Sequence, residues 1–152
     1  MNRIYLLVVL LGLSFGACKK EVDQDEVDRL KIEEYLADNN LSAEMDPSGL
    51  YYIIEEQGTG TQPNPSSRVR VRYKGYLLDG TVFDQTTGDK TAVFNLGGLI
   101  PGWRIAIPLL KEGGKGIFIH PSGLAYGPFS PGSPIGPNEV LIFEIELVEV
   151  VS

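Results

Sequence analysis

The sequence has 152 residues, a length that suits one domain with additional segments, and 43% of these residues are hydrophobic. Its formal net charge of −7 argues against binding to nucleic acid through a basic surface. The only cysteine, Cys18, excludes an intrachain disulfide, so the globular part of the chain tolerates an oxidising compartment.

The first 17 residues have the layout of a secretory signal. Arg3 precedes an apolar run at 4–13 that is too short to span a membrane comfortably. Small residues before Cys18 resemble a bacterial lipoprotein signal, in which the cysteine becomes the lipidated first residue, although Phe15 departs from the usual aliphatic residue. We therefore expect a signal peptide at 1–17 and a lipid anchor on Cys18. A plain signal peptide with an incidental cysteine is the alternative.

Residues 18–46 are predicted to form a lipidated tether and a short helix. The segment 19–26 is polar, and helical spacing follows over 27–39, with Asp23 and Asp25 as candidate N-caps. The apolar face of this helix is thin and consists of Val27, Leu30, Tyr35 and Leu41. Because such a helix is marginal alone, we expect a dispensable spacer lying on its own domain, with a dimerisation helix as the alternative.

The remaining domain, at 47–152, opens with strand patterns. A turn at 46–49 leads into a strand at 50–55. The stretch 68–76 alternates between an apolar face, which includes Tyr73, and a basic face, as is typical of a half-buried antiparallel strand. Asp79-Gly80 predicts a hairpin turn after it.

A short helix and two further strands complete the predicted fold. The helix at 102–107 begins near Pro101 and ends before Pro108. Strands are expected at 116–120 and at 140–150, where Leu141, Phe143, Ile145 and Leu147 share one face. These elements predict an α+β fold, in which a curved antiparallel β-sheet is wrapped around one short α-helix, with an N-terminal helical extension.

Five short motifs follow one another in the second half of the chain. They are Val71-Arg72-Tyr73-Lys74-Gly75, Asp79-Gly80-Thr81-Val82-Phe83-Asp84, Leu99-Ile100-Pro101-Gly102-Trp103, Leu124-Ala125-Tyr126-Gly127 and Leu141-Ile142-Phe143-Glu144-Ile145-Glu146-Leu147. In this order and spacing they resemble the FKBP-type peptidyl-prolyl isomerases over about residues 49–151. The resemblance implies an FKBP-like fold and a deep apolar pocket for proline, with no cofactor and no metal.

The resemblance also implies a role for each pocket residue. Trp103 would form the floor beneath the proline ring. The Ile100 backbone N–H and the Tyr126 hydroxyl would bind substrate carbonyls, and Asp84 would lie near the twisting carbonyl. Asp84, Tyr126 and Phe143 are the predicted catalytic residues. The predicted substrate-binding residues are Tyr73, Phe83, Leu99, Ile100, Trp103 and, in a flap at 128–137, Ile135.

Three positions depart from the family's pattern. Ala92 stands where many members have a pocket aromatic, Lys90 is the nearest cation to Asp84 where an arginine is expected, and Gly136 replaces a proline. The first two departures leave open a weakly active or inactive chaperone or binding module with the same pocket. His120, the only histidine, is expected to be structural.

The sequence thus predicts a peptidyl-prolyl cis-trans isomerase that assists the folding of envelope or secreted proteins. Its expected partners are proline-containing unfolded or nascent envelope proteins, macrolide ligands and, through the N-terminal lipid, a membrane. The expected location is the bacterial cell envelope, at the periplasmic side of the outer membrane or on the cell surface. A surface adhesion protein or a nutrient-system accessory protein is a third interpretation, which only the anchor and tether support.

Overall fold

The computed structural model describes residues 22–151, so the predicted signal peptide and Cys18 lie outside the described residues. The strands are β1 (Glu44–Met45), β2 (Tyr51–Glu56), β3 (Arg68–Leu77), β4 (Val82–Gln85), β5 (Ala92–Asn95), β6 (Lys115–His120) and β7 (Leu141–Val151). The helices are α1 (Gln24–Asp38) and α2 (Pro101–Ala106), with single 3₁₀ turns η1 (Leu96–Gly98), η2 (Ile107–Leu109) and η3 (Ser122–Leu124).

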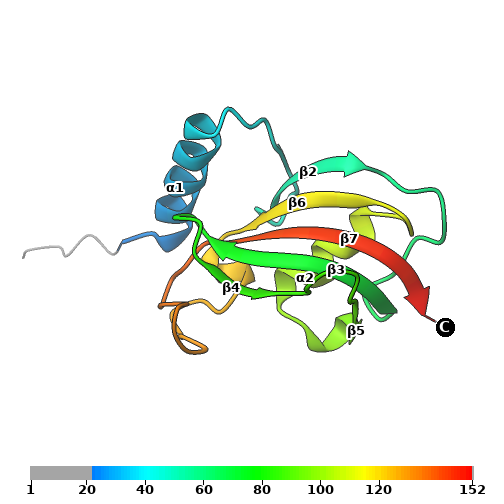
Figure 1. Ribbon diagram of the computed structural model, residues 1–152. Helices are drawn as coiled ribbons and strands as arrows, with labels where there is room; N and C mark the ends of the chain where they lie inside the picture. Colours follow the sequence, from blue (N-terminus) through cyan, green and yellow to red (C-terminus); the bar gives the residue numbers. More distant parts are fainter. Residues whose placement is uncertain (1–21, 152) are drawn as a thin grey trace, which may run out of the picture.

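All of these strands pair antiparallel in one seven-stranded sheet, in the order β1-β2-β6-β7-β3-β4, with β5 also paired to β3. The sheet curves around α2, while α1 lies against the opposite face (Figure 1). The predicted α+β fold, with one short helix inside a curved sheet and an N-terminal helical extension, is confirmed.

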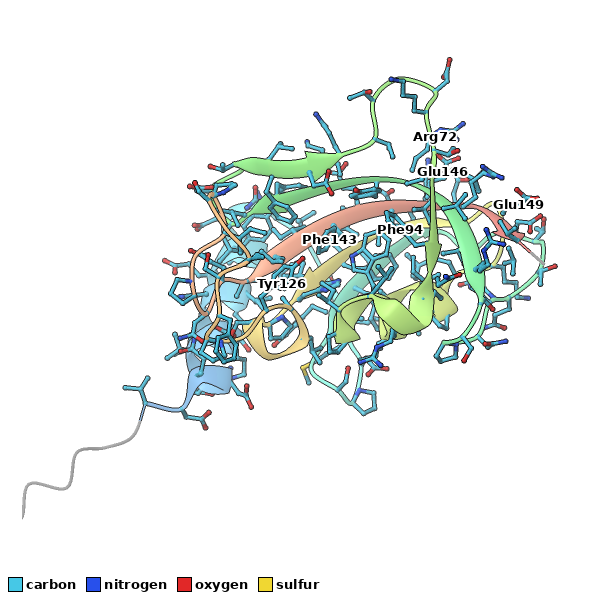
Figure 2. All side chains as sticks on the ribbon, turned by 90° about the horizontal axis from the view of Figure 1, so that it is seen from below. Arg72, Phe94, Tyr126, Phe143, Glu146 and Glu149 are labelled. Atoms are coloured by element: carbon cyan, nitrogen blue, oxygen red, sulfur yellow. The ribbon has the colours of Figure 1, made fainter. Side chains whose placement is uncertain are left out.

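The two longest strands, β3 and β7, form the centre of the sheet. The apolar face of β3 is buried at Val69 and Val71, as its alternation predicts. On the other face, Arg70 and Arg72 form ion pairs with Glu149 and Glu146 of β7. Figure 2 shows Arg72 beside Glu146. The Arg72 Nη1 and the Glu146 Oε1 are 2.9 Å apart. Since both side chains are about 40% exposed, this pair contributes little to stability.

Helix α2 fills the concave side of the sheet. Pro101 occupies its first turn, where the missing N–H costs nothing because that group has no partner inside a helix. A Cβ at Gly102 would lie 2.2 Å from the His120 Nδ1, so only glycine lets the helix pack this closely on β6. Helix α2 ends at Ala106, and Pro108 lies in the 3₁₀ turn η2 that follows.

Helix α1 lies on its own domain, as expected, but its buried face differs from the predicted one. Leu30 is 53% exposed, whereas Ile32 is fully buried in a second apolar cluster with Tyr51, Ile119, Val140 and Ile142. The prediction of a thin face that includes Leu30 was therefore wrong. The Asp23 carboxylate caps the helix by accepting a hydrogen bond from the Asp25 N–H.

Three short strands were not predicted from the sequence. They are β1, β4 and β5, of two to four residues each. Such runs are too short to show an alternation, and each is specified by its pairing with a longer neighbour. Strand β4 follows the predicted hairpin turn, in which the Gly80 N–H donates to the Leu77 carbonyl. Within residues 22–151, no helix is both long enough and apolar enough to cross a membrane.

Candidate active site

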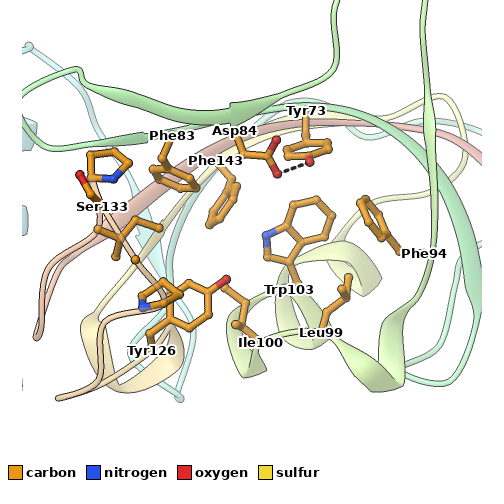
Figure 3. A pocket seen from close by; sticks show the side chains of 14 residues that line it. Tyr73, Phe83, Asp84, Phe94, Leu99, Ile100, Trp103, Tyr126, Ser133 and Phe143 are labelled. Atoms are coloured by element: carbon orange, nitrogen blue, oxygen red, sulfur yellow. Dashed lines mark hydrogen bonds between the residues drawn. The ribbon is translucent and has the colours of Figure 1, made fainter.

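A cavity of about 350 Å³ opens beside α2, bounded by the concave side of the sheet and by the flap (Figure 3). The structure brings every predicted pocket residue to its lining. These residues are Tyr73, Phe83, Asp84, Leu99, Ile100, Trp103, Tyr126, Ile135 and Phe143. Phe94 and the flap residues Pro131, Gly132, Ser133 and Pro134 complete the lining.

Trp103 lies at the centre of this lining and is only 4% exposed. Its indole meets the rings of Tyr73, Phe94 and Phe143 edge to face, with centroids 5.3 to 5.7 Å apart and planes at 82 to 86°. Aromatic rings favour this arrangement because the positive edge of one ring meets the negative face of the other. The three neighbours therefore fix the indole as a rigid apolar surface.

Phe83 in β4 and Phe143 in β7 extend the aromatic lining on either side of β3. Their rings are in edge-to-face contact, with centroids 5.5 Å apart. Both rings cross over Gly75, the β3 residue that is paired with Phe143. A Cβ at Gly75 would lie 2.6 Å from the Phe83 ring and 2.8 Å from the Phe143 ring. Gly75 is thus a pocket-shaping residue, and the sequence signal for it is a glycine inside the predicted strand, two residues after Tyr73 and therefore on the same face.

Asp84 has a hydrogen-bond partner, although no arginine stands where the family pattern expects one. The Tyr73 hydroxyl donates to the Asp84 carboxylate, 2.5 Å away (Figure 3). Burial, followed by this hydrogen bond, raises the pKa of Tyr73 above its ordinary value, so the phenol stays a donor at neutral pH. The Tyr73 hydroxyl therefore holds the Asp84 carboxylate at the cavity, although the sequence alone indicated no partner for Asp84.

Ile100 presents a backbone donor at the start of α2. The Ile100 carbonyl accepts a hydrogen bond from the backbone N–H of Trp103, whereas the Ile100 N–H donates to no acceptor among residues 22–151. An unpaired N–H beside an apolar cavity can bind a carbonyl of a ligand. Leu99, the preceding residue, lines the same side of the cavity.

Tyr126 approaches the cavity from the side opposite Asp84 and is 41% exposed (Figure 3). The amides on either side of it, those of Ala125 and Gly127, both donate to the Ser122 carbonyl, at 3.0 and 2.8 Å. The Gly127 carbonyl in turn accepts the Asn138 N–H at 2.7 Å, which closes the base of the flap. The position of Tyr126 therefore depends on the η3 turn.

The flap at 128–137 covers one side of the cavity with Ile135, which is 7% exposed. The Ile135 N–H donates to the Gly132 carbonyl, and the Ser130 hydroxyl donates to the Ile135 carbonyl. Contacts within the flap thus hold this apolar side chain over the pocket.

Phe94 is the pocket residue that the sequence analysis missed. The sequence predicted a lower wall at Ala92, but Phe94, two residues further along β5, packs against both Trp103 and Tyr73. Because alternate residues of a strand share a face, a strand prediction at 92–95 would have identified it. The aromatic wall is present and comes from this neighbouring position.

His120 packs against the cavity lining from behind, with its ring 5.0 Å from that of Phe143. It is fully buried, and neither ring nitrogen has a hydrogen-bond partner within residues 22–151. Burial lowers the pKa of His120 to about 3, so the ring is neutral at physiological pH. In the described part of the chain no three His, Cys, Asp or Glu side chains are grouped as metal ligands.

Comparison with known proteins agrees with this geometry. The sequence pattern of the family described as FKBP-type peptidyl-prolyl cis-trans isomerase matches residues 59–148. The outer membrane protein MIP of Legionella longbeachae is 50% identical over 105 residues, which cover 68% of this chain and 45% of that protein. A probable FKBP-type peptidyl-prolyl cis-trans isomerase, FkpA, of Neisseria meningitidis serogroup B is 40% identical over 137 residues, 88% of this chain and 50% of that protein.

Solved structures show the same fold. The crystal structure of FkpA from Escherichia coli matches with a TM-score of 0.72 and 37% identity, over 83% of this chain and 60% of that one. A peptidyl-prolyl cis-trans isomerase from Pseudomonas syringae pv. tomato matches with a TM-score of 0.74 and 33% identity, over 85% of this chain and 94% of that one. The chain spans about half the length of the relatives it matches in sequence. On the sequence match, the fold and the cavity together, this chain belongs to the FKBP-type peptidyl-prolyl cis-trans isomerase family.

Proposed function

We propose that this protein is a peptidyl-prolyl cis-trans isomerase that binds the proline ring of a substrate over Trp103. The observation that carries the proposal is the rigid aromatic floor and walls of the cavity, with Asp84 and Tyr126 on opposite sides of it. Such a pocket offers apolar surface to the ring and a few polar groups to the neighbouring amides.

The proposed reaction needs no nucleophile and no proton transfer. Rotation about a peptide bond faces a barrier of about 18–20 kcal/mol because the nitrogen lone pair is delocalised into the carbonyl. The twisted amide has lost this delocalisation and is less charge-separated than the planar one, so an apolar site favours it. Each increment of about 1.4 kcal/mol in preferential binding of the twisted form accelerates the reaction about tenfold.

The polar groups then fix the substrate backbone. The Ile100 N–H and the Tyr126 hydroxyl donate to carbonyls on either side of the proline, and Asp84 acts electrostatically near the twisting bond. The Tyr73 hydroxyl, which is bonded to Asp84, supports this assignment because it orients the carboxylate without neutralising it. Asp84, Tyr126 and Phe143 are thus the proposed catalytic residues.

Two contacts in the structure count against the chaperone alternative. It was based on an open wall at Ala92 and on an Asp84 without a partner. Phe94 supplies an aromatic ring to the lining beside Trp103, and the Tyr73 hydroxyl donates a hydrogen bond to Asp84. We therefore favour catalysis over binding alone.

A protease-coupled isomerisation assay on a short peptide with one Xaa-Pro bond tests the proposal. The purified protein should accelerate isomerisation, and Trp103→Leu should weaken substrate binding while partly sparing turnover. Arg104→Gln, next to Trp103 in α2 but exposed, is the control and should match the parent. An inactive parent that still binds proline peptides would overturn the proposal in favour of a binding module.

The proposed place of action is the bacterial envelope, with Cys18 carrying the lipid anchor. The lipoprotein-like sequence before Cys18 supports this, as does the name of the Legionella relative, an outer membrane protein. The proposed substrates are unfolded or nascent envelope proteins that contain proline. Macrolides are proposed as ligands of the same apolar cavity.

A further inference from the structure

Asp28 is a fully buried carboxylate in α1, far in sequence from the cavity. Its Oδ2 accepts hydrogen bonds from the Ser122 N–H at 2.7 Å and from the Ser122 hydroxyl at 2.6 Å, and its Oδ1 accepts one from the Gln24 amide at 2.7 Å. Burying a carboxylate is costly unless hydrogen bonds replace its hydration. The buried position of Asp28 therefore depends on Ser122.

Ser122 is the first residue of the η3 turn, and it is buried as well. The first amides of a helical turn have no partner within the turn, so Asp28 satisfies a donor that would otherwise be left unpaired. The Ser122 carbonyl accepts the N–H groups of Ala125 and Gly127, the two neighbours of Tyr126. Hydrogen bonds on both sides of Ser122 thus connect Asp28 of α1 to the backbone on either side of Tyr126.

The position of α1 itself is fixed by apolar packing. Ile32 lies one helical turn after Asp28 on the same face and is fully buried against Tyr51, Ile119 and Ile142. These strand residues hold α1 on the sheet, so Asp28 reaches Ser122 from a rigid support. The contact is therefore a fixed brace between the helix and the η3 turn.

We propose that Asp28 is a positioning residue that acts through Ser122 to hold the Tyr126 hydroxyl at the cavity. The N-terminal helix is then part of the active-site support and more than a spacer. The expected effect of Asp28 on turnover rests on the proposed function, whereas its expected effect on the Tyr126 backbone is independent of that function.

Hydrogen exchange measured by NMR tests the backbone effect directly. In Asp28→Asn the amides of Ala125 and Gly127 should exchange at least about tenfold faster than in the parent, while the Phe143 amide in β7 should stay within about twofold. Asp38→Asn makes the same chemical change at an exposed position of the same helix, and it should leave all three amides unchanged. Unchanged exchange at Ala125 and Gly127 in Asp28→Asn would overturn the inference whether or not the protein is active.

A double-mutant cycle on kcat/KM tests the effect on turnover. Asp28→Asn should lower kcat/KM about three- to tenfold in the parent background but less than about twofold in the Tyr126→Phe background, where no hydroxyl remains to be positioned. Equal losses in both backgrounds would mean that Asp28 acts on general stability, and they would overturn the inference.

Ser122→Ala provides a second variant should Asp28→Asn fail to fold, because it removes the hydroxyl and keeps the backbone hydrogen bond. The same pattern in the cycle is expected from it, with a smaller loss. A parent without isomerase activity would contradict the proposed function alone, since the exchange measurement still decides whether Asp28 positions the Tyr126 backbone.

Discussion

Tyr73 performs two tasks in the cavity, and each uses a different part of the side chain. Its ring packs edge to face on Trp103, and its hydroxyl donates to the Asp84 carboxylate. A neutral hydroxyl holds the carboxylate in place and leaves its negative charge intact, whereas an arginine would cancel that charge. The negative charge of Asp84 is therefore available to act on the substrate amide.

Asp84→Leu tests this electrostatic role. The variant loses the carboxylate and leaves the Tyr73 hydroxyl without its acceptor, so isomerase activity should fall but not vanish, because the apolar surface of Trp103 remains. Since no proton is transferred, the activity of the parent should vary little between about pH 6 and 8. Activity measured across this range checks both statements.

Asp89→Leu, at an exposed position in the same part of the chain, serves as the control and should retain full activity. A bell-shaped pH dependence of the parent, together with complete loss in Asp84→Leu, would indicate acid–base catalysis and contradict the mechanism.

His120 makes the stability of the fold sensitive to acid. In the unfolded chain its pKa returns to about 6.5, whereas burial lowers it to about 3 in the folded protein. Between these values the unfolded chain binds a proton that the folded protein does not, so stability falls as the pH falls through this window. We expect a loss of about 2 kcal/mol between pH 7 and pH 5.

Urea unfolding at the two pH values measures this loss. His120→Leu, which replaces the ring by an apolar side chain, should abolish most of the pH dependence whatever its effect on absolute stability. The same slope in the parent and in His120→Leu would show that other groups cause it.

At the scale of elements, α1 is joined to the domain by both apolar and polar contacts. Ile32 packs into the cluster on the outer face of the sheet, and Asp28 bonds to Ser122 of the η3 turn. The helix also has exposed ion pairs, between Arg29 and both Glu26 and Glu33, which contribute little because they are solvated. The contacts with the sheet and with η3 therefore decide whether α1 is ordered.

Ile32→Ala should destabilise the whole domain by about 2–5 kcal/mol, because it leaves a cavity between α1 and the sheet. Leu30→Ala, on the exposed side of the same helix, should change stability by less than about 0.5 kcal/mol. Thermal or urea unfolding of the two variants measures the difference. Equal and small effects would restore the view that the helix is dispensable.

At the scale of the whole molecule, the cavity is built by strand order. Tyr73 in β3 and Phe143 in β7 are 70 residues apart, yet β3 and β7 are neighbours in the sheet, and both rings reach Trp103 of α2. The flap and the β4 hairpin then bring Ile135 and Asp84 to the same cavity. No segment of the chain contains the site by itself.

The N-terminal lipid anchor is also a property of the whole molecule. With Cys18 intact, the mature protein should be found with the membranes, and Cys18→Ser should either release it or leave the signal uncleaved, because the acylated residue is lost. Membrane fractionation with immunoblotting reports both outcomes. Ser14→Ala, which keeps the cysteine, is the control, and unaltered processing of Cys18→Ser would contradict the lipoprotein prediction.

Long strands and turns were predictable because their signals are local. The alternation at 68–76 lies in a strand that is buried mainly on one side, and such strands show a period of two. In β7, Leu141 and Phe143 share one face, while Ile142 between them is buried on the other face against α1. Strands β1, β4 and β5 carry no such signal, and Phe94 was missed with β5. The buried face of α1 was misjudged because Asp28 is polar and Ile32 offers the only fully buried apolar side chain of the helix.

The sequence by itself determined the family, the fold class and most members of the pocket, because the ordered motifs place aromatic residues at strand ends and at one helix. Tertiary structure alone decided three relations that join distant segments. The Tyr73 hydroxyl bonds to Asp84, Phe94 lines the cavity against Trp103, and Asp28 bonds to the turn that precedes Tyr126. Each of these relations depends on a contact between residues of different elements, and the spacing of residues within one segment does not predict such a contact.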